Sequence, residues 1–138
     1  MCTFNEGVAQ DKAEALAKKS GFSAKVVTTY TGGMLLILST SSKKEIGRIG
    51  LETISPGLDQ YAVSTGLWVD DFYRGTLVTD FLDQWKEEVA RNSGIKALLA
   101  LVRTDNAPEL ARMFKGGWKM LKHTKGDPDH LLFCKDLV

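Results

Sequence analysis

The chain has 138 residues, 43% of them apolar, and a formal net charge of +1 at neutral pH. This length and apolar content favour one folded domain over residues 1–138 and argue against disorder. The near-neutral charge predicts no nucleic-acid partner and no membrane partner, and no apolar run approaches the roughly 20 residues that span a bilayer. Because the sequence also lacks the basic-then-apolar start of a signal peptide, we expect a cytoplasmic protein.

The first half of the chain predicts one helix followed by a series of strands. Strong helix formers occupy residues 11–20, and Gly21 ends them. Four β-type runs follow, each separated from the next by a polar or glycine-containing turn, at residues 24–30, 34–39, 45–54 and 61–69. Glycines inside the third run indicate a β-bulge.

A second helix and a strongly apolar strand come next. Apolar residues recur on one broad helical face from Leu77 onward, Lys86 falls on the polar side, and Gly94 ends the helix. Residues 96–102 then form a continuous apolar run, of the kind that is buried on both faces of a sheet.

The last third of the chain predicts a short helix and a pair of strands. Asp105-Asn106 can cap a helix over residues 107–115, with Pro108 in its first turn. Two apolar runs on either side of the turn "KGDPD" form the terminal pair. This order of elements is that of a mixed α+β domain built on one central sheet.

The cysteines and histidines give no sign of a metal site. Cys2 and Cys134 lie near opposite ends of the chain, and neither His123 nor His130 has a His or Cys at metal-ligand spacing. We therefore predict reduced thiols and no metal. Cys134 also lacks the His-plus-acid set that would activate it as a nucleophile.

The stretch from Trp68 to Trp85, "WVDDFYRGTLVTDFLDQW", takes a strand through a tight turn into a helix. The first amides of such a helix have no partner within it, and with the positive end of the helix dipole they suit a phosphate or diphosphate. Gly75 permits the turn, Arg74 adds charge, and the amides of residues 76–79 would face the anion. Many turns of this kind bind nothing, so the pattern alone leaves both interpretations open.

In these residues the sequence resembles the GNAT family, the Gcn5-related N-acetyltransferases, whose core motif runs Val-x-Pro-x-Tyr-Arg-Gly-x-Gly-x-Gly/Ala. Val69 and the triplet Tyr73-Arg74-Gly75 match that motif at the right spacing. Further on, "ALLALVRTDN" and "APELARMFKGGW" match the family's strand, Asp-Asn pair and short helix, with Gly117-Trp118 in the place of Gly-Phe. The resemblance covers most of the chain and is firmest over residues 67–118.

The resemblance implies a GNAT-like mixed sheet of about six to seven strands, splayed in the middle and flanked by about three to four helices. It also implies acetyl-CoA as co-substrate and an amine as acceptor. The diphosphate of CoA would sit on the turn after Arg74, the pantetheine arm would lie along residues 67–69, and an N–H near Trp68 or Val69 would stabilise the oxyanion. The implied cofactor-binding residues are Trp68, Val69, Arg74, Gly75, Thr76, Leu77, Val78, Thr79 and Asn106.

Three positions depart from the family pattern. Leu77 and Thr79 replace small loop residues, which predicts weaker binding of CoA unless Leu77 instead packs in the core, as its place on the apolar helix face suggests. Met113 stands where many members carry a Tyr that protonates the leaving thiolate. His123 is the nearest downstream acid, although a hairpin histidine is more typical of a solvated surface.

Two carboxylates, Asp70 and Asp71, follow the strand that the resemblance places in the active cleft, and Asp71 replaces the family's Pro. A lysine-type acceptor amine must lose a proton before it attacks, because its ordinary pKa is about 10.4. Asp70, Asp71 or Glu52 could accept that proton through water, and we name these three as candidate catalytic residues. Alternatively, the acids cap the turn or stay solvated.

All three tryptophans fall on strand or helix faces that we expect to be buried, namely Trp68, Trp85 and Trp118. An aromatic pocket for the acceptor has no support in the sequence.

Two functional hypotheses lead. One is an acetyl-CoA-dependent N-acetyltransferase that acts on a small-molecule or protein amine by direct attack on the thioester. The other is a catalytically inactive GNAT-like domain, of a kind encoded by phages, that works as a binding or assembly protein. A third is a CoA or nucleotide sensor. The short segment before the sheet leaves the acceptor side open to a partner chain, such as the second subunit of a homodimer.

Overall fold

A computed structural model describes residues 4–54, 60–74, 77–124 and 127–137, with the backbone alone described at 122–124 and 127–128. Helices, strands and one short 3-10 helix alternate along the chain. In order they are α1 (Glu6–Ser20), β1 (Ser23–Thr28), β2 (Met34–Ser39), β3 (Glu45–Thr53), β4 (Tyr61–Val69), η1 (Asp71–Tyr73), α2 (Leu77–Asn92), β5 (Ala97–Arg103), α3 (Ala107–Lys115), β6 (Lys119–Thr124) and β7 (Asp127–Asp136).

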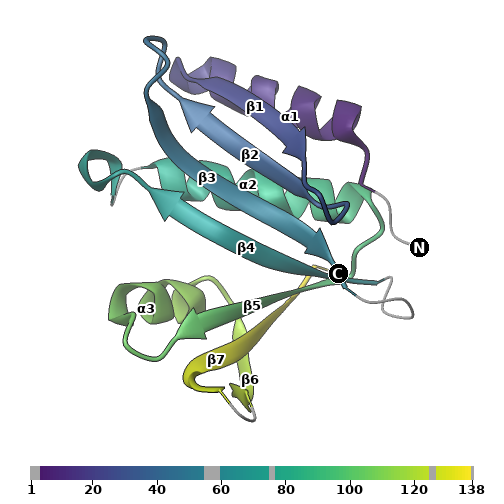
Figure 1. Cartoon of the computed structure of the whole chain (residues 1–138), viewed down its shortest axis with the longest axis vertical. Coiled ribbons are helices and arrows are strands. Elements are labelled where there is room, and N and C mark those ends of the chain that lie inside the picture. The colour runs from purple at the N-terminus through teal and green to yellow at the C-terminus, as the bar shows by residue number, and fades with distance from the viewer. Residues whose placement is uncertain (1–3, 55–59, 75–76, 125–126, 138) are drawn as a thin grey trace.

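The strands form one seven-stranded sheet in the order β1-β2-β3-β4-β5-β7-β6 (Figure 1). Neighbouring strands run antiparallel except β4 and β5, which are parallel and joined by α2. The last strand, β7, lies between β5 and β6, so it is an interior strand. The mixed, helix-flanked sheet predicted from the sequence is therefore confirmed.

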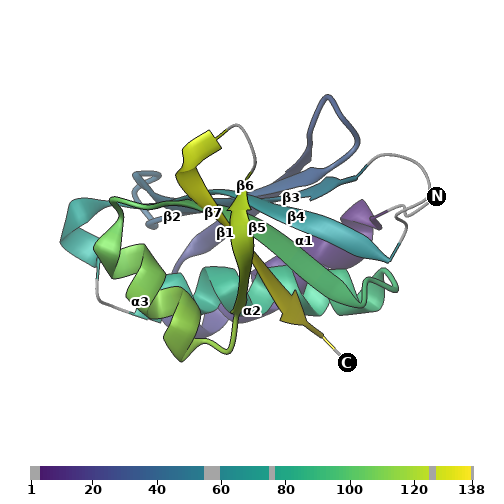
Figure 2. The same cartoon turned by 90° about the horizontal axis from the view of Figure 1, so that it is seen from below.

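The helices lie on one side of the sheet, and none of the described residues forms a helix on the opposite face (Figure 2). α1 packs beside α2 through a row of small residues, Ala9, Ala13 and Ala17, whose spacing of four puts them on one face. Small side chains let the two helices approach closely, and the fully buried Trp85 of α2 donates its indole N–H to the carbonyl oxygen of Ala9 at 3.0 Å. In the described ranges, no helix has the length and apolar character needed to cross a bilayer.

α1 begins five residues earlier than predicted. Asn5 caps it by accepting a hydrogen bond from the backbone N–H of Val8 at 3.0 Å, an N-cap that the search for helix formers missed. The end of the helix follows the prediction, because Gly21 takes the left-handed conformation with φ 73°. β2, β4 and α3 have the predicted bounds.

Two predictions of burial, for β5 and Trp68, are wrong because only one face of the sheet is covered, and a third, for Lys86, is wrong because pairing with Asp83 permits its burial. β5 is not buried on both faces: Leu101 points to the uncovered face and is 53% exposed. Trp68 of β4 is 39% exposed and lies beside the Arg48 guanidinium, 5.8 Å from the ring centroid. Trp85 and Trp118 are buried, as predicted. Lys86, expected on the polar side of its helix, is buried as well.

Candidate active site

β4 and β5 separate partway along their length. They pair only through Tyr61–Ala97, Ala62–Leu98 and Val63–Leu99, although β4 runs on to Val69 and β5 to Arg103. Beyond these pairs each strand bonds only to its outer neighbour, β3 or β7. The ribbons diverge at this point (Figure 1). Two strand edges therefore face each other across a gap.

A bulge in β4 accompanies this separation. The register with β3 passes from Arg48–Trp68 to Gly50–Thr65, so one β3 residue lies opposite both Gly66 and Leu67. Gly66 has φ 59°, a left-handed conformation that glycine adopts at low cost, and bulges of this type bend the strand that carries them. The GNAT resemblance implied a sheet splayed in its middle, and the bulge supplies the local cause.

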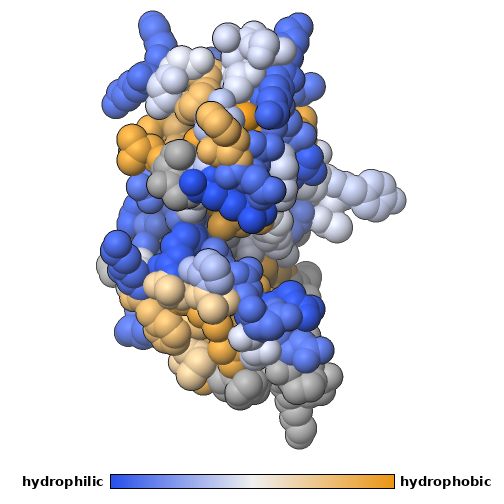
Figure 3. All heavy atoms as spheres, turned by 90° about the vertical axis from the view of Figure 1, so that its left-hand side faces the viewer, coloured by the Kyte–Doolittle hydropathy of each residue, from blue (hydrophilic) through white to orange (hydrophobic). Residues whose placement is uncertain are grey.

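The gap forms a cleft with two adjoining cavities. The outer cavity, of about 370 Å³, is lined by Trp68, Val69, Arg74, Thr79 and Pro108. The inner cavity, of about 270 Å³, is lined by residues that include Ser64, Lys86, Met113, Trp118 and His130. Leu67, Asn106, Glu109 and Arg112 line both. A band of hydrophilic residues crosses the middle of the molecule on the side that lies at the left in Figure 1 (Figure 3).

The structure brings together five of the nine residues implied to bind the cofactor. Those five, which line the outer cavity, are Trp68, Val69, Arg74, Thr79 and Asn106. Gly75 and Thr76 lie outside the described residues. The side chain of Val78 points into the core, where it packs near Gly47.

Leu77 lies on the surface rather than in the core. It is 79% exposed, so the alternative that it packs in the core is wrong, and it is not among the described residues that line either cavity. The reason is its position at the first turn of α2, one residue before the buried series begins at Val78. The Leu77 side chain therefore does not fill the outer cavity.

Arg74 is held at the mouth of the outer cavity by its own turn. Its Nε donates to the carbonyl oxygen of Val69 at 3.2 Å, and its Nη1 pairs with the Asp71 carboxylate at 3.0 Å. Asp70 caps the short helix η1 by accepting from the N–H of Phe72 at 3.1 Å. These contacts fix the base of the guanidinium group while leaving it exposed to solvent.

The third candidate acid lies on a different part of the sheet. Glu52 of β3 accepts hydrogen bonds from the hydroxyls of Thr29 at 2.8 Å and Thr31 at 2.5 Å, so it stabilises the turn between β1 and β2. The described residues that line the two cavities do not include Asp70, Asp71 or Glu52. In the described chain, no group of three His, Cys, Asp or Glu side chains is arranged to hold a metal ion.

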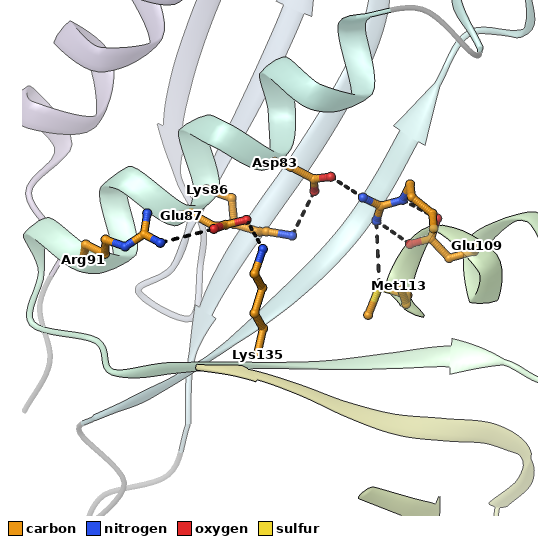
Figure 4. Close-up of polar contacts among 8 residues, drawn as sticks. Asp83, Lys86, Glu87, Arg91, Glu109, Met113 and Lys135 are labelled. Carbon is orange, nitrogen blue, oxygen red and sulfur yellow. Dashed lines mark hydrogen bonds and ion pairs between the residues drawn. The ribbon is translucent and has the colours of Figure 1, made fainter. Parts of the chain in front are cut away.

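Sequence reasoning missed a group of four charged residues in the cleft. The cleft network consists of Asp83 and Lys86 on α2 and of Glu109 and Arg112 on α3 (Figure 4). Lys86 Nζ donates to Asp83 at 3.1 Å, and Arg112 Nε donates to Glu109 at 2.9 Å. Arg112 also donates to the other oxygen of Asp83, which joins the two helices. The i,i+3 spacing in each helix was a readable signal for the pairs within a helix.

Burial and pairing act oppositely on the two cations of this network. Burial lowers the pKa of Lys86, against the opposing effect of Asp83. Burial also works against the charge of Arg112, but its hydrogen bonds to Glu109 and the charge of Asp83 prevail and raise its pKa. Arg112 therefore holds its proton firmly, whereas Lys86 is the easier group to deprotonate.

The comparisons identify the architecture. An acetyltransferase of the GNAT family from Staphylococcus aureus superposes with a TM-score of 0.68 over 93% of this chain and 78% of that protein, at 14% identity. Nourseothricin acetyltransferase gives 0.66 over 86% of this chain and 85% of its own, at 15% identity. This chain has the GNAT fold. The PaiA N-acetyltransferase of Thermoplasma acidophilum, solved in complex with coenzyme A, gives 0.64 over 75% of this chain and 60% of its own, at 20% identity.

No protein-family model matches the chain, and no curated protein matches it significantly in sequence. Identities of this size establish the fold alone.

Proposed function

We propose that the chain transfers an acetyl group from acetyl-CoA to an amine. The observation that carries the proposal is the cleft between the parted strands β4 and β5, whose outer cavity ends at Arg74 and Thr79. A helix start next to an arginine suits a diphosphate, because free backbone amides, the helix dipole and the guanidinium all favour negative charge. The coenzyme A complex of a protein with the same fold is consistent with this choice of donor.

The remaining groups of the cleft fit the same reaction. The edge of β4 beyond Val63 has no described β5 partner, so a pantetheine arm can add to it as a strand-like ligand. An N–H near Trp68 or Val69 would then stabilise the oxyanion of the tetrahedral intermediate. Asn106, which lines both cavities, would contact the arm or the departing sulfur.

The acceptor amine needs a route for its proton. Amines of the lysine type are protonated at neutral pH, since their ordinary pKa is about 10.4. Asp70, Asp71 and Glu52 remain our candidates for accepting this proton through water. Asp70 and Asp71 lie next to the mouth of the outer cavity in sequence, which places them closer to an incoming amine than a residue of the β1–β2 side. The acceptor is a small-molecule or protein amine.

A second candidate function is a GNAT-like domain without catalysis, which binds a partner or takes part in an assembly. It is favoured by Met113, which lines the inner cavity and has no proton to give. It is also favoured by Leu77, which puts an apolar side chain on the surface where the GNAT loop has a small residue. Acetyl-CoA binding separates the two candidates.

We expect Arg74→Ala to weaken the binding of acetyl-CoA about tenfold, because a charge-assisted contact to the diphosphate is lost. Isothermal calorimetry on the wild type and the variant measures the effect. Arg91→Ala is the matched control, since Arg91 is an arginine near the end of α2 that pairs with Glu87 at 3.5 Å and lines neither cavity in the described structure. We expect it to bind acetyl-CoA like the wild type.

Two results would count against this proposal. Wild-type protein that takes up no acetyl-CoA at millimolar concentration would leave the non-catalytic function as the better one. Equal affinity of wild type and Arg74→Ala would show that the diphosphate lies elsewhere. Release of CoA in the presence of an amine panel then identifies the class of acceptor.

A further inference from the structure

The wall of the inner cavity contains a buried cation. Lys86 is 1% exposed, and it is the one charged residue in the described chain that is buried to this degree. Taking an ammonium group out of water is costly, so a fold retains one only with compensation. Here the described partners of Lys86 compensate only part of this cost, and the ammonium lies beside the cavity.

The partners of the Lys86 ammonium account for part of its hydrogen-bonding capacity. The group carries three N–H donors, and among the described residues Asp83 alone accepts from it, at 3.1 Å. The single negative charge of Asp83 is shared between two cations, because its second oxygen accepts a hydrogen bond from Arg112 (Figure 4). The ring of Trp118 lies 5.1 Å from Nζ and offers a cation–π contact. Capacity therefore remains for an anion in the adjoining cavity.

The reaction proposed above produces such an anion, and the inference rests on that function. With the diphosphate at Arg74 and the carbonyl oxygen near Trp68, an arm that follows β4 inward leaves its sulfur where the two cavities adjoin, on the side towards Lys86 and Met113. When the bond between carbonyl carbon and sulfur breaks, the sulfur leaves with the electron pair. A leaving thiolate is stabilised by a nearby positive charge or by a proton.

We propose that the Lys86 ammonium receives the leaving thiolate, first stabilising its charge and then giving it a proton. The amine nitrogen forms the new bond to the acetyl carbon, the carbon–sulfur bond breaks, and a proton moves from Nζ to sulfur. CoA leaves as the thiol, and Lys86 is briefly a neutral amine. The acceptor ammonium loses two protons in all. The first passes to water through a base before the nitrogen attacks, and the second leaves the tetrahedral intermediate and restores the charge of Lys86, so the cycle closes without another reactant.

Other donors in the inner cavity fit this role less well. Met113 has no proton to give, and the raised pKa of Arg112 keeps its proton in place. The amide of Asn106 and the hydroxyl of Ser64 do not ionise near neutral pH. His130 also lines the cavity, so the experiment includes it.

The charges around Lys86 support proton transfer. Asp83 and Glu87 on its own helix and Arg112 on α3 are the charged groups that act on it, and Lys135 of β7 reaches Glu87 at 2.9 Å. Burial lowers the Lys86 pKa below its ordinary value. A lowered pKa makes the ammonium a stronger acid and therefore a better proton donor to a leaving thiolate.

The test uses CoA itself, the free thiol, bound to the whole chain. Ultraviolet absorbance of the thiolate, followed against pH, gives the pKa of the bound thiol without any turnover. We expect wild-type protein to hold at least about tenfold more thiolate than Lys86→Met at a pH below both thiol pKa values, since an adjacent cation favours the anion. Lys18→Met, on exposed α1, is the matched control and behaves like the wild type.

A second variant separates charge from proton donation. Lys86→Arg keeps a cation that does not release its proton, so we expect it to retain the bound thiolate while acetyl transfer slows about a hundredfold. Lys86→Met loses both properties. Far-ultraviolet circular dichroism and CoA affinity show that each variant is folded.

The outcomes are distinct. Wild-type protein that binds no CoA overturns the proposed function and this inference with it. If Lys86→Met binds CoA and shows the wild-type thiolate fraction, the Lys86 role alone is wrong. A fall in thiolate on His130→Gln, with none on Lys86→Met, would assign the role to His130 instead.

Discussion

We expect Asp83→Ala to lower the free energy of unfolding by about 3 kcal/mol at neutral pH, because it strands two partly or fully buried cations. Asp83 is the one acceptor for Lys86 among the described residues, and it also binds Arg112. Arg112 keeps Glu109, so most of the loss comes from Lys86. Urea unfolding at constant pH measures it. Asp11→Ala, at an exposed position of α1, is the control and changes stability by less than about 0.5 kcal/mol.

The loss of stability in Asp83→Ala depends on pH with a defined sign. The pKa of Lys86 is lower in the folded chain than in the unfolded chain, so the unfolded chain binds more protons between the two values. Stability therefore rises with pH through that window. Removing Asp83 takes away an effect that raises the Lys86 pKa, which extends the window to lower pH. The deficit of the variant should shrink as pH rises, and a deficit that grows with pH would contradict this account.

We expect Trp85→Ala to destabilise the chain by about 3–5 kcal/mol, the range for removing a large aromatic side chain from a core. Trp85 is fully buried, and its indole N–H ties α2 to the carbonyl of Ala9 on α1. The variant leaves a cavity between the helices and an acceptor without its donor. Thermal and urea unfolding both report the change.

Trp68→Ala is the matched control for the Trp85 experiment. Trp68 lies on the face of the sheet that no helix covers, where its ring is partly in water and contacts Arg48. We expect a loss of no more than about 1 kcal/mol. If the two variants were equally unstable, Trp68 would have to be covered in solution, by a partner or by another copy of the chain.

Local patterns were enough to predict the elements. α3 has the predicted bounds because Asn106 caps it, accepting from the Glu109 N–H at 3.3 Å, and because Gly116 and Gly117 follow its end. β2 and β4 have the bounds read from their apolar runs. The start of α1 was missed because a polar Asn5 outside the periodic segment decides it.

The hydrophobic pattern of the sequence could not predict which face of the sheet the helices cover. Trp68 and Leu101 are apolar and sit in strands, but their exposure depends on which face of the sheet the helices occupy. The error for Lys86 has the opposite sign. Its position on the helix predicts an exposed side chain, whereas the side chain is buried and its charge is compensated by Asp83 and the ring of Trp118. The cleft network was missed for the same reason, since Arg112 meets Asp83 across 29 positions of sequence.

The strand order β5-β7-β6 determines when the C-terminal part of the sheet can form during synthesis on the ribosome. β5 and β6 are synthesised before β7, yet both hydrogen-bond to it, with Ala97 opposite Asp136 and Lys119 opposite Cys134. Until residues 127–136 have left the exit tunnel, these two strands expose unpaired amides and carbonyls that invite aggregation. A nascent chain stalled before β7 should thus hold β1–β4 in protease-resistant form while the remainder is still cleaved.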